Sequence, residues 1–169
     1  MKDYKAYDSI GAVMKLHKHI VNVLYPKYIA IKGNSDAVYK SFLNGSEPKD
    51  VKNIERYFIP IYQVQHSSVM PNEFVLVKSL SQIDNGGVLQ NGYAEVCLYA
   101  KNVQLKSNST LPNLTFLQTF TEMVYSKLDN TIFDNFSITN IRSTTVNDAD
   151  NGFHYNSLLL TLLNVKTKK

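Results

Sequence analysis

The chemistry open to this chain depends first on its four histidines and its one cysteine. His17 and His19 are two residues apart on a predicted helix, so their side chains point to different faces and do not hold one metal ion together. A metal site needs three or four converging ligands, and His66 and His154 stand far from both in the sequence. The single cysteine, Cys97, permits neither an intrachain disulfide nor a cysteine-based metal site. We therefore expect no metal.

The remaining candidates for catalysis or cofactor binding lack the patterns that such chemistry requires. Ser67-Ser68 follows His66 without the G-x-S-x-G context of an activated serine. The paired glycines at 86 and 87 belong to neither a phosphate-binding loop nor a dinucleotide fingerprint. Cys97 lies in the middle of a predicted strand, where a free cysteine is usually a small buried hydrophobe. We expect no cofactor and no enzymatic activity.

Composition favours one globular domain spanning residues 1–169, because 44% of the residues are apolar and 19% are charged. The net charge is +4, but the basic residues are scattered apart from the KTKK tail. Specific nucleic-acid binders concentrate Lys and Arg on one face, so we do not expect that function. No signal-peptide core and no run of about 18 apolar residues is present, which predicts a cytosol-like compartment and no membrane contact.

The period of the apolar residues predicts the elements. In order they are a helix at 9–24, a short strand at 28–31, strands at 61–66, 74–80 and 93–100, a helix at 114–128, and strands at 136–145 and 153–165. Pro26 should end the first helix, 81–92 should be a polar loop, and 106–110 a linker. Asn151-Gly152 should supply the positive φ angles of a hairpin turn rather than part of a calcium loop, which would need a closing glutamate. This order predicts an α+β fold, a mostly antiparallel sheet with an N-terminal helix and a second long helix packed on it.

The pattern of the last third is the most informative. One face of the predicted helix at 114–128 carries Leu114, Leu117, Phe120, Val124 and Leu128. The final strand is apolar on both faces, with Leu158, Leu160 and Leu162 on one side and Phe153, Tyr155, Leu159, Leu163 and Val165 on the other. Such a strand must lie between two layers or in a subunit interface.

Residues 33–58 resemble an excursion from the core, with turn clusters and short helices predicted at 37–43 and 48–57. The chain has 11 tyrosines and 8 phenylalanines, more than a core of this size needs, and aromatic residues are enriched at interfaces. Ordinary packing explains them equally well. We predict that 33–58 is an insertion or arm, and that the subunit contacts are Tyr39, Phe42, Tyr57, Phe58, Leu158, Leu160 and Leu162.

Several segments together resemble the tail-terminator or tail-completion proteins of tailed bacteriophages. They are SIGAVMKLHKHIVNVLYPKYIAI, FVLVKSL, GYAEVCLYAK, LTFLQTFTEMVYSKL and DADNGFHYNSLLLTLLNV. The resemblance is one of element order and character, and it covers most of the chain outside residues 33–60. The segment from Gly33 to Phe58 is longer than the family pattern, which leaves a related neck or connector ring open as a different role.

The resemblance implies a structural virion protein that forms a head-to-tail ring in the phage neck or tail. Such a ring, six- or twelve-fold, completes the tail or joins it to the head and portal, and it contacts neighbouring neck, tail and portal proteins. It is made in the bacterial host cytoplasm and touches genome DNA only non-specifically. The alternative is a small non-enzymatic protein-binding module or an assembly chaperone that never enters a particle.

Overall fold

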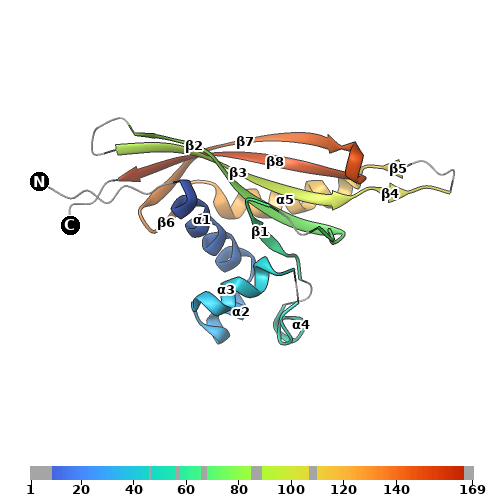
Figure 1. Ribbon diagram of the computed structural model, residues 1–169, viewed down its shortest axis with the longest axis horizontal. Coiled ribbons are helices and arrows are strands. Elements are labelled where there is room, and N and C mark those ends of the chain that lie inside the picture. Colours follow the sequence, from blue (N-terminus) through green and yellow to red (C-terminus); the bar gives the residue numbers. More distant parts are fainter. Residues whose placement is uncertain are drawn as a thin grey trace, which may run out of the picture.

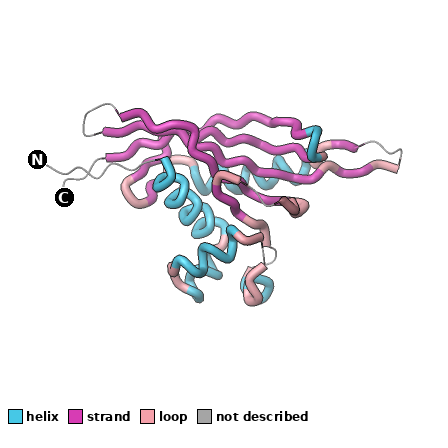
Figure 2. The backbone as a smooth tube through the Cα atoms, in the orientation of Figure 1, coloured by secondary structure: helices cyan, strands magenta, loops and turns pink. Residues whose placement is uncertain are grey.

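A six-stranded, mostly antiparallel sheet with helices against one face forms the frame of this α+β protein (Figure 1). The computed structural model describes residues 9–45, 47–55, 58–65, 68–84, 89–106 and 110–165. The strand order is β1-β2-β3-β8-β7-β6. Strands β2 and β3 form one hairpin and β7 and β8 form another, so the centre of the sheet joins two segments about sixty residues apart in sequence. The tube view in Figure 2 shows the long strands running together, with the helices below them.

The first helix, α1 (Ser9–Leu24), has the predicted bounds. Pro26 does not lead into a strand, however, because it occupies the first turn of a second helix, α2 (Pro26–Lys32). Proline at this position loses no helical hydrogen bond and has its φ angle already set. The predicted strand at 28–31 is therefore wrong. Gly33 ends α2 with φ 79°, and its N–H donates to the carbonyl oxygen of Ile29 at 2.8 Å.

The described part of residues 33–58 folds back onto the first two helices instead of extending as an arm. It contains α3 (Asp36–Leu43) and α4 (Val51–Ile54), so the helix predicted at 48–57 is much shorter and begins after Pro48. Phe42 is fully buried, and its ring centroid lies 4.8 Å from that of Tyr25 and 5.5 Å from that of Phe58. Helices α2, α3 and α4 form a small lobe beneath the sheet in Figure 1.

Three of the long strands (β2, β3 and β7) are longer than predicted, the last strand has the predicted bounds, and the strand predicted at 61–66 ends at Gln63. Strand β1 (Ile61–Gln63) pairs in parallel with β2 (Glu73–Asp84), which pairs with β3 (Leu89–Lys101) along its whole length. The predicted loop at 81–92 is therefore largely strand, since Gln82 pairs with Gly92 and Asp84 with Gln90. The sequence did not indicate this extension, because most residues at 81–92 are polar and show no alternation of apolar and polar side chains.

The last hairpin completes the sheet. Strand β7 (Phe136–Asp148) pairs with β8 (Phe153–Val165), and β6 (Ile132–Phe133) covers only the start of β7. The connection is a short 3-10 turn, Ala149–Asn151, followed by Gly152 at φ 70°. The turn was placed correctly, but only Gly152 has a positive φ angle, not Asn151.

Helix α5 (Leu114–Leu128) packs on the helix-bearing face of the sheet. Its side chains Leu117, Phe120, Val124 and Leu128 are buried as predicted, whereas Leu114 is 58% exposed. The Asn113 side chain caps the helix by accepting from the N–H of Phe116. Between β3 and α5, the segments on either side of the predicted linker at 106–110 pair as a small two-stranded ribbon, β4 (Val103–Gln104) and β5 (Thr110–Leu111), which projects beyond the end of the sheet in Figure 1.

The sheet has an apolar cluster on each face, and strand β2 shows why. Val75 and Val77 belong to the main core under the helices, while Phe74 and Leu76 join a second cluster on the outer face with Cys97, Tyr99 and Phe153. Residues 74–77 are all buried, so this part of β2 is covered on both sides. Strand β3 alternates in the same way, with Ala94, Val96 and Leu98 in the main core.

Candidate functional site

The three histidines in the described part of the chain lie apart in the fold and do not converge. His17 is 1% exposed in the core, His19 stacks on Phe133 with ring centroids 4.7 Å apart, and His154 Nδ1 lies 2.7 Å from Asn102 Oδ1. His66 and Ser67 lie outside the described residues. Within the described part of the chain, no group of three or more histidine, cysteine or acidic side chains is placed to hold a metal ion.

His17 acts as a structural tie between α1 and β1. Its Nε2 lies 2.8 Å from the carbonyl oxygen of Ile61. A carbonyl only accepts, so Nε2 carries the proton and Nδ1 remains an acceptor, which has no hydrogen-bond partner within the described chain. Burial, reinforced by the nearby Lys18 charge and opposed by the bond to Ile61, lowers the pKa of His17 to about 4. The side chain is therefore neutral at pH 7.

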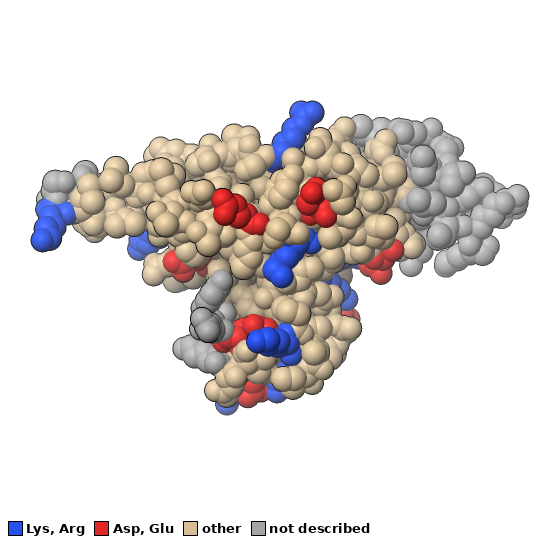
Figure 3. Space-filling view, turned by 180° about the vertical axis from the view of Figure 1, so that it is seen from behind, with Lys and Arg blue, Asp and Glu red and all other residues tan. Residues whose placement is uncertain are grey.

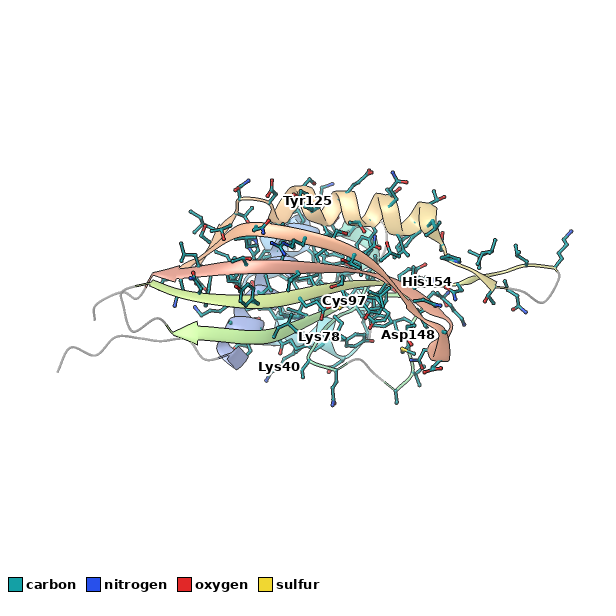
Figure 4. All side chains as sticks on the ribbon, turned by 90° about the horizontal axis from the view of Figure 1, so that it is seen from above. Lys40, Lys78, Cys97, Tyr125, Asp148 and His154 are labelled. Carbon is teal, nitrogen blue, oxygen red and sulfur yellow. The ribbon has the colours of Figure 1, made fainter. Side chains whose placement is uncertain are left out.

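Cys97 lies near the middle of the sheet, with Lys78 close by on the neighbouring strand (Figure 4). The cysteine is fully buried, and burial raises the pKa of its thiol to about 12. A nucleophilic cysteine needs the opposite shift, toward thiolate. Beside it, Glu95 accepts a 2.6 Å hydrogen bond from Ser157 and lies 3.6 Å from Lys78 Nζ. These polar groups contact one another on the outer face.

Two hollows among the described residues show what kinds of side chain line them. A cavity of about 290 Å³ between α1, α4 and α5 is lined mainly by apolar side chains, among them Ile54, Phe120 and Met123. A second hollow beside α1 is lined by two lysines, Lys15 and Lys18. Lys15 Nζ lies 2.8 Å from Asp134 Oδ2, so the positive charge of the hollow is partly neutralised. Figure 3 shows charged side chains of both signs scattered over one face, with no dense basic patch on that face.

Most of the residues predicted to form subunit contacts lie inside the protein's own core. Tyr39 is 5% exposed, Phe42, Leu158 and Leu160 are fully buried, and Leu162 is 2% exposed. The helices supply the layer that the sequence required over this face of β8, so its leucines need no neighbouring subunit and present no surface to one. Phe58 is partly buried against the same core. Tyr57 lies outside the described residues.

The ribbon is an exposed surface that the sequence analysis missed. Val103 pairs with Leu111 across β4 and β5, so both side chains lie on one face, and Leu105 follows Val103 at the same-side spacing of an extended chain. These three side chains are 47%, 51% and 39% exposed, in the order given. Gln104 and Thr110 pair on the opposite face. The alternation V-x-L was the available signal, but three residues are too few for a period to stand out.

The outer edge of β7 is a second unpartnered surface. Strand β6 covers only Phe136 and Ser137, and no strand among the described residues pairs with the outer side of 139–148. Most of these side chains are exposed. Below this edge, a groove of about 380 Å³ separates β7 from α5, and it is lined by Leu114, Gln118 and Glu122 from the helix and Thr145 from β7. Figure 4 shows α5 running alongside β7.

A comparison of the chain with protein-family models and with curated proteins found no match. Of the described helices, none is both long enough and apolar enough to cross a bilayer. Among the described residues, the fold leaves open an amphipathic ribbon and a strand edge above a groove.

Proposed function

We propose that this protein is a structural component of a tailed bacteriophage particle, forming a ring in the neck or tail that completes the tail or joins it to the head and portal. The ring is a closed homo-oligomer of six or twelve copies, and it acts by contact with neighbouring neck, tail and portal proteins. The chain performs no chemistry, and genome DNA touches it only non-specifically. It is made in the host cytoplasm and works in the virion.

The observation that carries this proposal is the arrangement of the segments that resemble tail-terminator and tail-completion proteins. Those segments correspond to α1 with α2, to β2 and β3, to α5, and to the last turn with β8. Their three long strands are adjacent in one sheet, β2-β3-β8, and both α1 and α5 pack on it. Distant parts of the sequence thus contribute to one unit, as expected if the resemblance reflects a shared fold.

A second observation favours assembly over a solitary module. The chain presents two different unpartnered surfaces, the apolar face of the ribbon and the outer edge of β7. A contact between unlike surfaces is heterologous, and repetition of such a contact around an axis closes a ring. A binding module for one unrelated partner needs only one such surface.

The proposal is tested on particles of the phage that would encode the chain. Purified virions are analysed by mass spectrometry and by electron cryo-microscopy. We expect the chain in the particles, as a ring of density between portal and tail, and its gene beside portal and capsid genes. Particles that contain no copy of the chain, or a gene in no phage-like neighbourhood, would overturn the proposal. A chain present during assembly but absent from finished particles would identify an assembly chaperone instead.

A further inference from the structure

The ribbon of this protein has an apolar face that its own chain leaves uncovered. Val103, Leu105 and Leu111 lie on that face, each at least 39% exposed, in a ribbon with only two residues per strand. An isolated two-stranded hairpin is at best marginally stable in water. The ribbon is nevertheless anchored at its base, where the N–H of Asn102 donates to the carbonyl oxygen of Gly152 at 3.0 Å. The ribbon therefore projects from the rest of the protein with its apolar face exposed to solvent.

The outer edge of β7 is the natural acceptor for an extended segment. Residues 139–148 would span about 33 Å at the rise of a strand, and their outward backbone groups have no strand partner in the described chain. Proteins usually protect such an edge with lysine, proline or a short length. This one has no lysine and no proline between 139 and 148, and Arg142 is its only basic residue. Its protection is limited to an irregularity between Ile138 and Asn140.

The groove beside that edge is opposite in charge to the ribbon. It combines apolar surface, from Leu114 and Leu117, with one charged side chain, Glu122. Residues 102–113, which hold the ribbon, carry Lys106 and no other charged residue. An added strand would therefore pair its backbone with β7, place its apolar side chains over the groove and bring Lys106 toward the groove that contains Glu122.

We propose that the β4–β5 ribbon of one copy docks against the outer edge of β7 in a second copy of this chain, with its Val103 face over the groove formed by α5. The partner is a second copy because donor and acceptor lie on the same sequence and neither has a strand partner on its outer side among the described residues. In charge, Lys106 of the ribbon is opposite to Glu122 of the groove, while Arg142 and Asp148 on the β7 edge balance one another. The inference rests on the proposed function in one respect, since both require self-association. It goes beyond that function by naming the two surfaces that meet.

Engineered cysteines test this contact in the purified full-length chain. One preparation carries Val103→Cys and another carries Gln118→Cys on the groove, so only an intermolecular disulfide can join them. The mixture is oxidised at the highest soluble concentration and resolved on a non-reducing gel. The native Cys97 gives little background, because it is fully buried and its pKa is raised. The matched control replaces Val103→Cys by Gln104→Cys, which lies on the opposite face of the ribbon.

The expected result is a disulfide-linked dimer from the mixture that contains Val103→Cys. The mixture that contains Gln104→Cys should give at least about tenfold less linked dimer, because its thiol faces away from the groove. Equal yields from both mixtures, or no linked dimer from either, would overturn the inference. Sedimentation then compares Val103→Asp with Gln104→Asp, which add the same charge to opposite faces. Val103→Asp should weaken self-association by about tenfold or more, and the control should not. An equal loss in both would show that charge, not the apolar face, matters.

The two proposals fail separately. A linked dimer with no copy of the chain in virions supports the ribbon contact and removes the phage function. A chain found in virions, with no selective linkage in the cysteine assay, removes the ribbon contact alone. A chain that carries both Val103→Cys and Gln118→Cys separates the two ways of closing the assembly. If its oxidation gives only a linked dimer rather than a ladder of higher oligomers, the contact is retained and the ring is not.

Discussion

His17 makes the stability of this protein depend on pH, by an amount that follows from its surroundings. The ordinary histidine pKa of 6.5, which applies to the unfolded chain, falls to about 4 in the folded protein because the ring is buried. Between these values the unfolded state binds more protons than the folded state, so stability rises with pH across that window. Above pH 6.5 the titration of His17 leaves the free energy of unfolding unchanged. As the pH falls from 6.5 toward 4, the free energy of unfolding decreases progressively.

The size of the effect can be worked out. Each unit of pKa difference corresponds to about 1.36 kcal/mol, so the full difference for His17 is about 3.4 kcal/mol below pH 4. At pH 5, where most carboxylates are still ionised, roughly 2 kcal/mol of this should already be lost. The cause is that a proton on the unpartnered Nδ1 would place a charge in the core with no acceptor facing it.

The measurement is the free energy of unfolding from urea titrations at pH 7 and pH 5, followed by circular dichroism. The matched variant is His17→Gln, whose side-chain amide can still donate to the Ile61 carbonyl oxygen but does not titrate. His19, whose pKa burial also lowers, is unchanged in both proteins and cancels from the comparison. The wild type should lose about 2 kcal/mol more than the variant between the two pH values. An excess below about 0.5 kcal/mol would refute the reasoning, because the burial of His17 would then not suppress its charge.

Three further predictions concern stability. Leu117→Ala should lower the free energy of unfolding by about 2–5 kcal/mol, because the side chain is buried beneath the sheet. Leu114→Ala, on the same helix but 58% exposed, should change it by less than about 0.5 kcal/mol. Similar values for the two variants in urea melts would mean that α5 does not pack as described. Cys97→Ser should lower the free energy of unfolding by about 1–3 kcal/mol through the buried hydroxyl and leave particle assembly intact, and a folded but inactive variant would contradict the structural role of the thiol. Val64→Asn should stabilise the protein by about 1 kcal/mol, because Val64 has φ 63° and asparagine adopts that conformation at lower cost. The side chain is 60% exposed, so little packing is lost. An unchanged or lower urea midpoint would show that the valine is not strained.

Local patterns predicted those elements whose residues are set by near neighbours. The bounds of α1, the buried stripe of α5 from Leu117 to Leu128 and the hairpin around Gly152 all follow from spacing within a few turns or strand repeats. The segment 28–31 was misread because a four-residue apolar run fits a strand or a helix equally well. The residue that decides between them is Pro26, which both ends one helix and begins the next.

The apolar residues of β8 show that a sequence pattern does not say which part of the protein covers a buried face. The sequence requires a cover over Leu158, Leu160 and Leu162, but a subunit interface and an internal helix layer satisfy that requirement equally. The structure supplies the layer from within the chain, and these leucines are core residues. The same holds for Phe42, whose burial depends on Tyr25 and Phe58 reaching it from elsewhere in the chain.

Periodicity and motif spacing are properties of the chain read in order, and they were enough to predict the fold class and most of the helices and long strands. Which apolar side chains lie inside and which remain on the surface depends instead on how the elements pack. The ribbon face of Val103 and Leu111 and the free edge of β7 became visible only once the sheet order was known. Exposure is a relation between segments distant in sequence, and it is settled when those segments pack together.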